Sequence, residues 1–302
     1  MNTRCGTKIA AVAWRPGPVD RVACVTMLLM KPADNHVHTE WSWDTSLEAS
    51  MERSCERAVS LGIPSIAFTE HVDFTAWGDG DGADHRGVEI ATRTYSQPLD
   101  VEGYLACVER CRDRFPGLRV LTGIEAGEPH LFPGSVAGVL AGGHFQRVLG
   151  SLHSVVEGER LVAADSLYGA IPAIDVMRRY LGELLRLVKG SDAFEVLAHA
   201  DFPRRYWPAG EGPYDEAEFE DEYRAVFREL AASGRVLEMN TRSPLWSVSL
   251  LRWWRDEGGR AVSFGSDAHL PWRVGARFDE AVAVVEAAGF RPGADRFDFW
   301  RR

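Results

Sequence analysis

The sequence of 302 residues contains very little lysine. Of its 34 basic side chains only Lys8, Lys31 and Lys189 are lysines, so almost all of the positive charge is carried by arginine. Acidic side chains number 44, which gives a formal net charge of −10. A protein of that charge repels the phosphate backbone of nucleic acids. The composition therefore disfavours a nucleic acid polymer as a partner.

Cysteine is also scarce, with five residues and no Cys-x-x-Cys pair. Cys107 and Cys111 are four residues apart in an apolar helical pattern, so we expect them to face the core rather than a metal. This cysteine usage favours a reducing compartment, and we expect a cytoplasmic protein. The apolar run at residues 22–30 is shorter than the about 20 residues that cross a bilayer, so no membrane association is expected.

From Ala33 onward, short apolar runs alternate with segments of helical periodicity. The alternation predicts a parallel α/β sheet. Seven such units without a break in composition favour one closed or nearly closed barrel over residues 31–302. Residues 1–30 are expected to be a disordered arm or the product of a start codon placed too early. The expected strands are residues 33–38, 65–69, 120–124, 147–152, 196–199, 235–239 and 261–264, and the helical segments include 46–61, 101–115, 173–188, 215–233 and 250–257.

Six of the nine histidines fall at or just beyond the C-terminal ends of these strands. The third strand ends in Glu125 instead. His36 and His38 are two residues apart and therefore face the same side of a strand, as do Asp267 and His269 if the last strand continues that far. Because the C-terminal ends of parallel strands meet at one mouth of a barrel, we expect a shared metal site there. The six histidines are His36, His38, His71, His153, His199 and His269.

The chemistry of these ligands limits the choice of metal. Imidazole and carboxylate groups suit Zn, Mn or Fe. The absence of cysteine ligands argues against a closed structural zinc site.

Six motifs, in this order, resemble the PHP (polymerase and histidinol phosphatase) superfamily, and they are most similar to its stand-alone histidinol-phosphatase branch. The resemblance spans about residues 34–275. It implies a distorted (β/α)7 TIM-like barrel, the PHP fold, with its metal site at the C-terminal ends of the strands. The motifs are His36-Val37-His38, Glu70-His71, Gly123-Ile124-Glu125, Ser151-Leu152-His153-Ser154, Ala198-His199 and Gly265-Ser266-Asp267-Ala268-His269.

The resemblance also implies two to three divalent metal ions. Glu125 would bridge the first two, and Asp44 would join the third at a position that some relatives fill with histidine. Asp44 has a competing interpretation as the N-cap of the following helix. The implied ligand sets are His36, His38, Glu125 and Asp267 for the first metal, Glu125, His153 and His199 for the second, and Asp44, His71 and His269 for the third.

The function implied by the resemblance is that of a metal-dependent phosphomonoesterase, a histidinol-phosphatase of histidine biosynthesis that converts L-histidinol phosphate and water to L-histidinol and phosphate. A metal-bridging hydroxide would attack phosphorus directly. Glu125, Asp267 and His269 are the expected catalytic side chains. The proton for the leaving group could come from a bound water, from His269 or from Asp267, and the sequence leaves this open.

Four arginines follow the fifth, sixth and seventh strands and are candidates for binding phosphate. The guanidinium group suits this role because its fork can donate two hydrogen bonds to one phosphate. The expected partner is therefore a small-molecule phosphate ester. The four are Arg204, Arg205, Arg242 and Arg273.

Three other functions are compatible with parts of this pattern. The main alternative is a PHP-family phosphodiesterase or nucleotide phosphatase that acts on another small phosphoester. A barrel amidohydrolase would also begin with His-x-His, but no lysine follows a strand end to form a carboxylated bridge. The third alternative is a metal-binding barrel without catalytic activity. The sequence leaves the oligomeric state open.

Overall fold

Parallel β-strands form the centre of the protein. The computed structural model describes residues 31–75, 98–158 and 160–302, so the expected N-terminal arm at residues 1–30 lies outside the described residues. Within these ranges the main sheet has the order β1-β2-β3-β4-β7-β8-β9-β10, and every pair is parallel except the last. The strands are β1 (Asp34–Val37), β2 (Ser65–Val72), β3 (Arg119–Gly127), β4 (Arg147–Ser151), β7 (Val196–Leu197), β8 (Val236–Asn240), β9 (Ala261–Gly265) and β10 (Trp300–Arg301).

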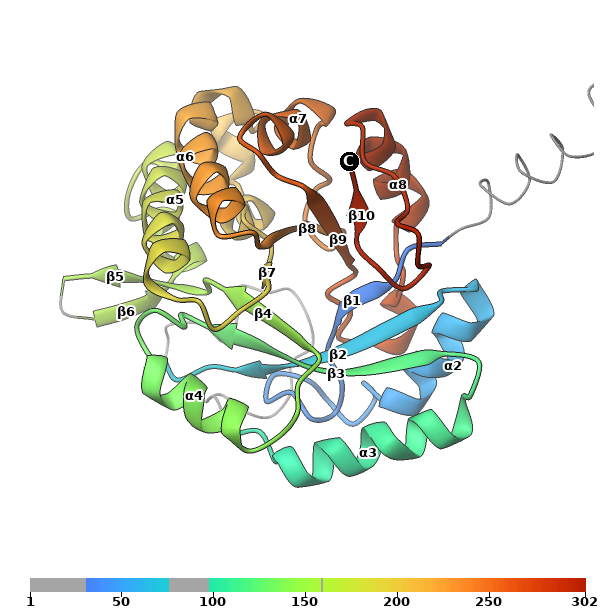
Figure 1. Cartoon of the computed structure of the whole chain (residues 1–302). Helices are drawn as coiled ribbons and strands as arrows, with labels where there is room; N and C mark the ends of the chain where they lie inside the picture. Colours follow the sequence, from blue (N-terminus) through green and yellow to red (C-terminus); the bar gives the residue numbers. More distant parts are fainter. Residues whose placement is uncertain (1–30, 76–97, 159) are drawn as a thin grey trace, which may run out of the picture. The chain divides into compact units, whose positions relative to one another are not determined.

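The segment that follows β9 returns to β1 and closes the sheet into a distorted barrel (Figure 1). Val37 forms a parallel bridge with Ala268. The His38 amide donates to the carbonyl of Ala268 and the Asp267 amide donates to that of His36, each over 2.8 Å. The predicted fold class, a distorted TIM-like α/β barrel, is thereby confirmed.

The helices lie on the outer side of the strands (Figure 1). In the helix of residues 101–114, the buried side chains are Tyr104, Cys107, Val108 and Cys111, spaced three and four apart as on one face of a helix. The two cysteines thus face the core, as expected. The helices are α2 (Met51–Leu61), α3 (Val101–Arg114), α4 (Pro133–Ala141), α5 (Ala173–Gly190), α6 (Glu220–Ala232), α7 (Val248–Asp256) and α8 (Phe278–Ala287).

Some element boundaries differ from the expected ones. β2 and β3 run beyond residues 69 and 124, so His71 lies inside β2 rather than after it, and β3 continues for two residues past Glu125. The helix expected over residues 46–61 begins only at Met51, because the Ser50 side chain accepts the Arg53 amide and Glu40 accepts the Met51 amide over 2.7 Å.

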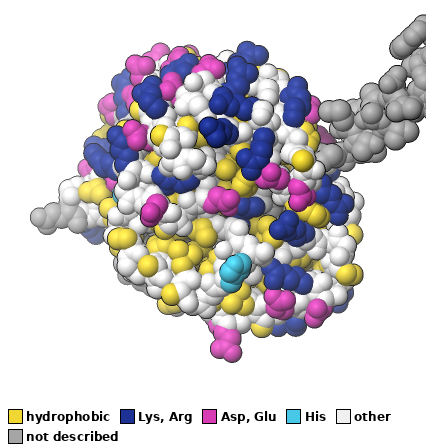
Figure 2. Space-filling view, viewed as in Figure 1, with side chains coloured by type: hydrophobic (Ala, Val, Ile, Leu, Met, Phe, Trp, Pro, Cys, Tyr) yellow, Lys and Arg dark blue, Asp and Glu magenta, His cyan; other side chains and the backbone are white. Residues whose placement is uncertain are grey.

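The sequence analysis did not single out α4, α8, β10 or the antiparallel hairpin of β5 (Ser154–Glu157) and β6 (Arg160–Ala163). The hairpin follows β4 directly. In the part of the chain that the structure describes, no helix has the length and apolar character needed to cross a membrane. Acidic and basic side chains are interspersed on the face seen in Figure 2.

Candidate metal centre

Histidine and carboxylate side chains from six strand ends meet in the interior of the barrel. His36 is in β1 and His38 follows it, while His71 and Glu125 are near the ends of β2 and β3. His153 follows β4. His199 follows β7, and Asp267 and His269 follow β9. His269 is partly exposed. The buried members of the cluster are His36, His38, His71, Glu125, His153, His199 and Asp267.

Glu125 is at the centre of this cluster. Its carboxylate lies within 3.3 Å of ring nitrogens from five histidines. Burial alone would raise its pKa, but His36, His153 and His71 outweigh burial and hold the pKa of Glu125 well below its usual range. The ring nitrogens are Nε2 of His199 at 2.7 Å, Nδ1 of His71 at 3.1 Å, and Nε2 of His36, His38 and His153 at 3.3 Å.

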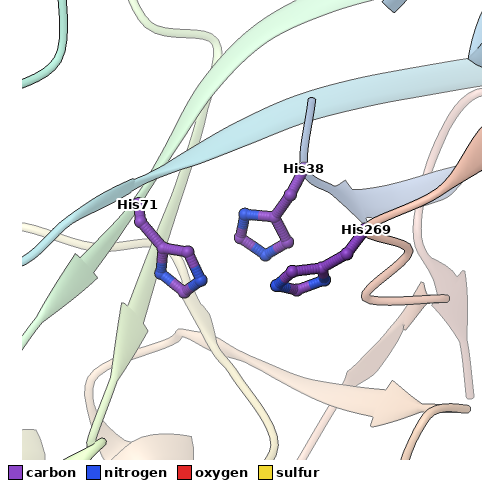
Figure 3. Close-up of side chains that lie close together, drawn as sticks. All are labelled: His38, His71 and His269. Atoms are coloured by element: carbon purple, nitrogen blue, oxygen red, sulfur yellow. The ribbon is translucent and has the colours of Figure 1, made fainter. Parts of the chain in front are cut away.

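A second group lies beside Glu125. The rings of His38, His71 and His269 converge from three segments of the chain (Figure 3). Asp44 Oδ2 is 3.0 Å from His269 Nε2 and 3.5 Å from His71 Nε2. Since α2 is capped by Ser50, the alternative interpretation of Asp44 as the helix N-cap is wrong.

Asp267 reaches the cluster through an unusual backbone conformation. Its φ is 51°, in the left-handed region, so β9 does not continue through Asp267 and His269 as the spacing argument allowed. The carboxylate nevertheless lies 3.5 Å from His38 Nε2 and 3.5 Å from His269 Nδ1. The turn after β9 therefore places the side chains of Asp267 and His269 at the site, although the two residues do not alternate along a strand.

Two of the four expected arginines also reach the cluster. Arg205 donates to Asp267 Oδ2 over 2.6 Å and Arg242 donates to Asp267 Oδ1 over 3.2 Å. Burial would raise the pKa of Asp267, but the two guanidinium groups hold it well below its usual range. Both arginines line a cavity of about 20 Å³ together with Glu125 and His269.

The other two arginines lie elsewhere. Arg204 and Arg205 are adjacent in the short 3-10 helix η2 (Phe202–Tyr206), in which successive side chains point about 120° apart. Arg204 consequently turns to Asp201 at 3.4 Å and to the ring of Tyr214. Arg273 is exposed and lies over the ring of Trp272.

The donor set fits divalent cations. Four groups of three side chains each offer ligand atoms that lie within 4.8 Å of one another. His71 is almost completely buried, yet neither of its ring nitrogens makes a hydrogen bond. A buried polar atom without a partner is costly, and coordination of a metal would satisfy it. The groups are His38, His71 and His269; His36, His38 and Asp267; His36, Glu125 and His199; and His71, Asp73 and His153.

Asp73 is a residue that the sequence analysis missed. Its Oδ1 is 3.1 Å from His153 Nδ1 and its Oδ2 is 3.4 Å from His71 Nδ1, and the Trp43 indole donates to it over 2.9 Å. The spacing could have identified Asp73, because it follows His71 by two residues just as His38 follows His36.

Other buried acids form hydrogen bonds with the histidines of the cluster or with residues that contact these histidines. Glu70 accepts hydrogen bonds from the Thr39 amide and the Ser42 hydroxyl, and Ser42 Oγ lies 3.1 Å from His38 Nδ1. Glu238 Oε1 lies 2.7 Å from His36 Nδ1. Such partners fix the orientation of ligating imidazoles in metal sites.

The fold and the site together define an α/β barrel whose strand ends carry buried imidazoles and carboxylates able to bind metal ions. Residues 34–242 match the PHP domain. Because the match covers more than half of the chain, the chain belongs to the PHP domain family.

Individual relatives are more distant. The histidinol-phosphatase of Lactococcus lactis subsp. lactis (strain IL1403) is 24% identical over 268 residues, which cover 86% of this chain and 93% of that protein. A probable histidinol-phosphatase of Deinococcus radiodurans is 26% identical over 281 residues, covering 85% of this chain and 94% of that protein.

Solved structures show the same fold. The crystal structure of the Lactococcus lactis histidinol phosphate phosphatase, complexed with zinc, L-histidinol and phosphate, has a TM-score of 0.73 at 23% identity and covers 86% of this chain and 94% of that chain. The crystal structure of a putative histidinol phosphatase from Listeria monocytogenes has a TM-score of 0.66 at 15% identity. The match covers 82% of this chain and 99% of that chain.

Proposed function

We propose that this protein is a metal-dependent phosphomonoesterase whose substrate is L-histidinol phosphate. The observation that carries the proposal is the position of Glu125 among five histidines, with Arg205 and Arg242 on the same small cavity. Imidazoles and carboxylates bind cations, while guanidinium groups bind phosphate. The substrate is supported by the names of relatives that align over most of their length.

The proposed ligands are those that the resemblance implied. His36, His38, Glu125 and Asp267 would hold one cation, Glu125 with His153 and His199 a second, and Asp44 with His71 and His269 a third. Zinc is the proposed metal because the Lactococcus lactis relative contains it. When bound, the cations would neutralise phosphate charge and lower the pKa of a coordinated water.

The side chains of this protein would orient the ester. Arg205 is held in place because its Nε donates to Ser243 Oγ over 2.7 Å and its Nη2 to Asn240 Oδ1 over 3.1 Å. Its guanidinium group can therefore bind phosphate oxygens without first losing conformational freedom. Phe202 and Tyr206 line the same cavity and form its apolar wall.

The test is a phosphate-release screen of purified protein loaded with zinc, manganese or iron. L-Histidinol phosphate is compared with nucleoside monophosphates, a cyclic dinucleotide and a generic aryl phosphate. We expect the highest kcat/KM with L-histidinol phosphate. Equal turnover of the aryl ester would refute the proposed substrate, and faster turnover of the cyclic dinucleotide would establish the phosphodiesterase alternative.

A further inference from the structure

The strand β8 contributes none of the proposed ligands, yet it carries two buried polar side chains directly behind the site. Glu238 and Asn240 are two residues apart and therefore face the same side of the strand. Their relative exposures are 1% and 2%. Buried polar groups at this position need a specific explanation, because a strand core is otherwise apolar.

Glu238 holds two histidines that come from different parts of the chain. Its Oε1 accepts a hydrogen bond from His36 Nδ1 over 2.7 Å, and its Oε2 accepts one from the His199 amide over 2.7 Å. On the adjacent strand β9, Gly265 pairs with Asn240, and a methyl group at Gly265 would overlap the Glu238 carboxylate and lie 2.6 Å from His36 Cβ. Glycine at this position leaves room for the Glu238–His36 pair.

The contact with Glu238 fixes the tautomer of His36. An ionised carboxylate can only accept hydrogen bonds, so Nδ1 of His36 must carry the proton. The lone pair of His36 is then on Nε2, which points to Glu125 Oε2 at 3.3 Å and to His38 Nε2 at 3.0 Å. A cation bound at Nε2 would complete a carboxylate–histidine–metal unit.

Asn240 connects to the phosphate side of the site through its amide oxygen. Its Oδ1 accepts hydrogen bonds from Arg205 Nη2 over 3.1 Å and from the Arg242 amide over 3.0 Å. Its Nδ2 donates to Glu238 over 3.1 Å and to Asp267 over 3.4 Å. The Ser243 amide also donates to Oδ1, over 3.3 Å, and these five partners fix the orientation of the amide.

We propose that Glu238 and Asn240 are positioning residues with separate roles, in which Glu238 orients the metal ligands His36 and His199 while Asn240 orients the phosphate-binding arginines. The inference rests on the proposed function, since it assumes that His36 and His199 bind metal and that Arg205 and Arg242 bind phosphate. Neither positioning residue needs to touch the substrate.

The first experiment measures zinc affinity by competition with a chromophoric chelator, independently of turnover. In Glu238→Gln, the amide cannot accept from both His36 and His199. If its NH2 faces His36, the ring must move its proton to Nε2, where it blocks coordination. We expect zinc affinity to fall about 10- to 100-fold, the usual effect of removing such a partner.

Two further variants separate positioning from packing. Glu238→Asp keeps a carboxylate in a shorter side chain, whereas Gln keeps the size and loses the charge. Positioning predicts that Asp retains more zinc affinity than Gln, and packing predicts the reverse. Glu183→Gln is the matched control, because Glu183 is a buried acid that accepts a hydrogen bond from His130 over 2.9 Å outside the cluster.

The second experiment tests the division of roles with Asn240→Ala. We expect the KM for L-histidinol phosphate and the inhibition constant of inorganic phosphate to rise about 10-fold, with zinc affinity within threefold of the wild type. Three results would each overturn the inference. These are an unchanged zinc affinity in Glu238→Gln, a higher zinc affinity in Glu238→Gln than in Glu238→Asp, and a loss of zinc in Asn240→Ala. If the wild type binds no zinc, the proposed function fails instead.

Discussion

Replacing Glu125 by glutamine should remove both metal binding and catalysis. The pKa of Glu125 lies well below its usual range because the surrounding histidines outweigh burial, so the side chain is ionised at neutral pH. Glutamine has nearly the same shape but no charge. The substitution therefore removes a full negative charge from the point at which five ring nitrogens meet.

The size of the effect follows from distances within the site. Ligand atoms of the group His36, Glu125 and His199 lie within 4.8 Å of one another, so a cation among them is no further than that from the carboxylate. At an effective dielectric constant of about 20, a divalent ion at about 5 Å interacts with a unit charge by about 7 kcal/mol. The neutral glutamine side chain is less costly to desolvate than the glutamate carboxylate. If this smaller desolvation cost offsets half of the lost charge interaction, about 3 kcal/mol of binding free energy is still lost. That loss corresponds to at least a 100-fold weaker affinity for the cation.

The assay combines metal analysis with kinetics. Wild type and Glu125→Gln are dialysed against the same free zinc concentration, and bound zinc is counted by plasma mass spectrometry. Phosphate release is then measured at saturating L-histidinol phosphate. Circular dichroism and the thermal midpoint of the metal-free proteins check that the variant is folded, with Glu183→Gln as the control for loss of a buried acid.

The reasoning would be refuted by one clear result. If folded Glu125→Gln binds as much zinc as the wild type, with the same affinity, then Glu125 does not bridge two cations. Retained turnover together with lost zinc would mean instead that the activity does not depend on these ions.

Four other outcomes can be measured. Arg205→Ala should lower kcat/KM about 10- to 100-fold, because charge-assisted hydrogen bonds to the phosphate are lost. Arg204→Ala removes the side chain that faces Asp201, so its steady-state kinetics should show little change in KM. Asp44→Ala should lower bound zinc by one equivalent in mass spectrometry. Tyr104→Phe should reduce the free energy of unfolding in urea by about 1–3 kcal/mol, because the Gly123 amide loses the acceptor it contacts over 2.8 Å. Chelation should abolish activity and lower the calorimetric thermal midpoint, since a ligand that binds only the folded state stabilises it.

The convergence of ligands could be predicted because it depends on few assumptions. Strands of a parallel barrel end on one side whatever their side chains, so residues at those ends must approach one another. His36 and His38 illustrate this, since their spacing of two residues places the Nε2 atoms 3.0 Å apart. The side chains lie close together although β2 and β3 are longer than expected, because a strand extended by three residues still ends at the same mouth.

Side-chain direction in the loops could not be predicted in the same way. Arg204 and Arg205 are equivalent in the sequence, and only the turn of η2 sends one to Asp201 and the other to Asp267. Asp267 itself adopts a positive φ, which no strand pattern anticipates. Loop conformation depends on contacts between segments far apart in the sequence, such as the hydrogen bond from the Asp267 amide to the His36 carbonyl.

The buried acids behind the ligands were overlooked for a different reason. Glu238 lies in the apolar run Val236–Asn240, and a search for ligands at strand ends passes over a strand interior. A carboxylate in such a run is itself informative, because burying an ion without partners costs several kcal/mol. A charged residue within an apolar strand near predicted ligands therefore indicates a partner for one of those ligands.

The same argument applies to the whole cluster. Asp44, Asp73, Glu125 and Asp267 are largely desolvated, and the positive groups that compensate them within the described residues are mainly Arg205, Arg242 and imidazoles. Replacing buried ion pairs by apolar residues of similar volume is often neutral or stabilising in proteins. The fold alone therefore does not explain this concentration of negative charge. Cations bound among the four acids would compensate their charge, whereas Arg205 and Arg242 both form their ion pairs with Asp267.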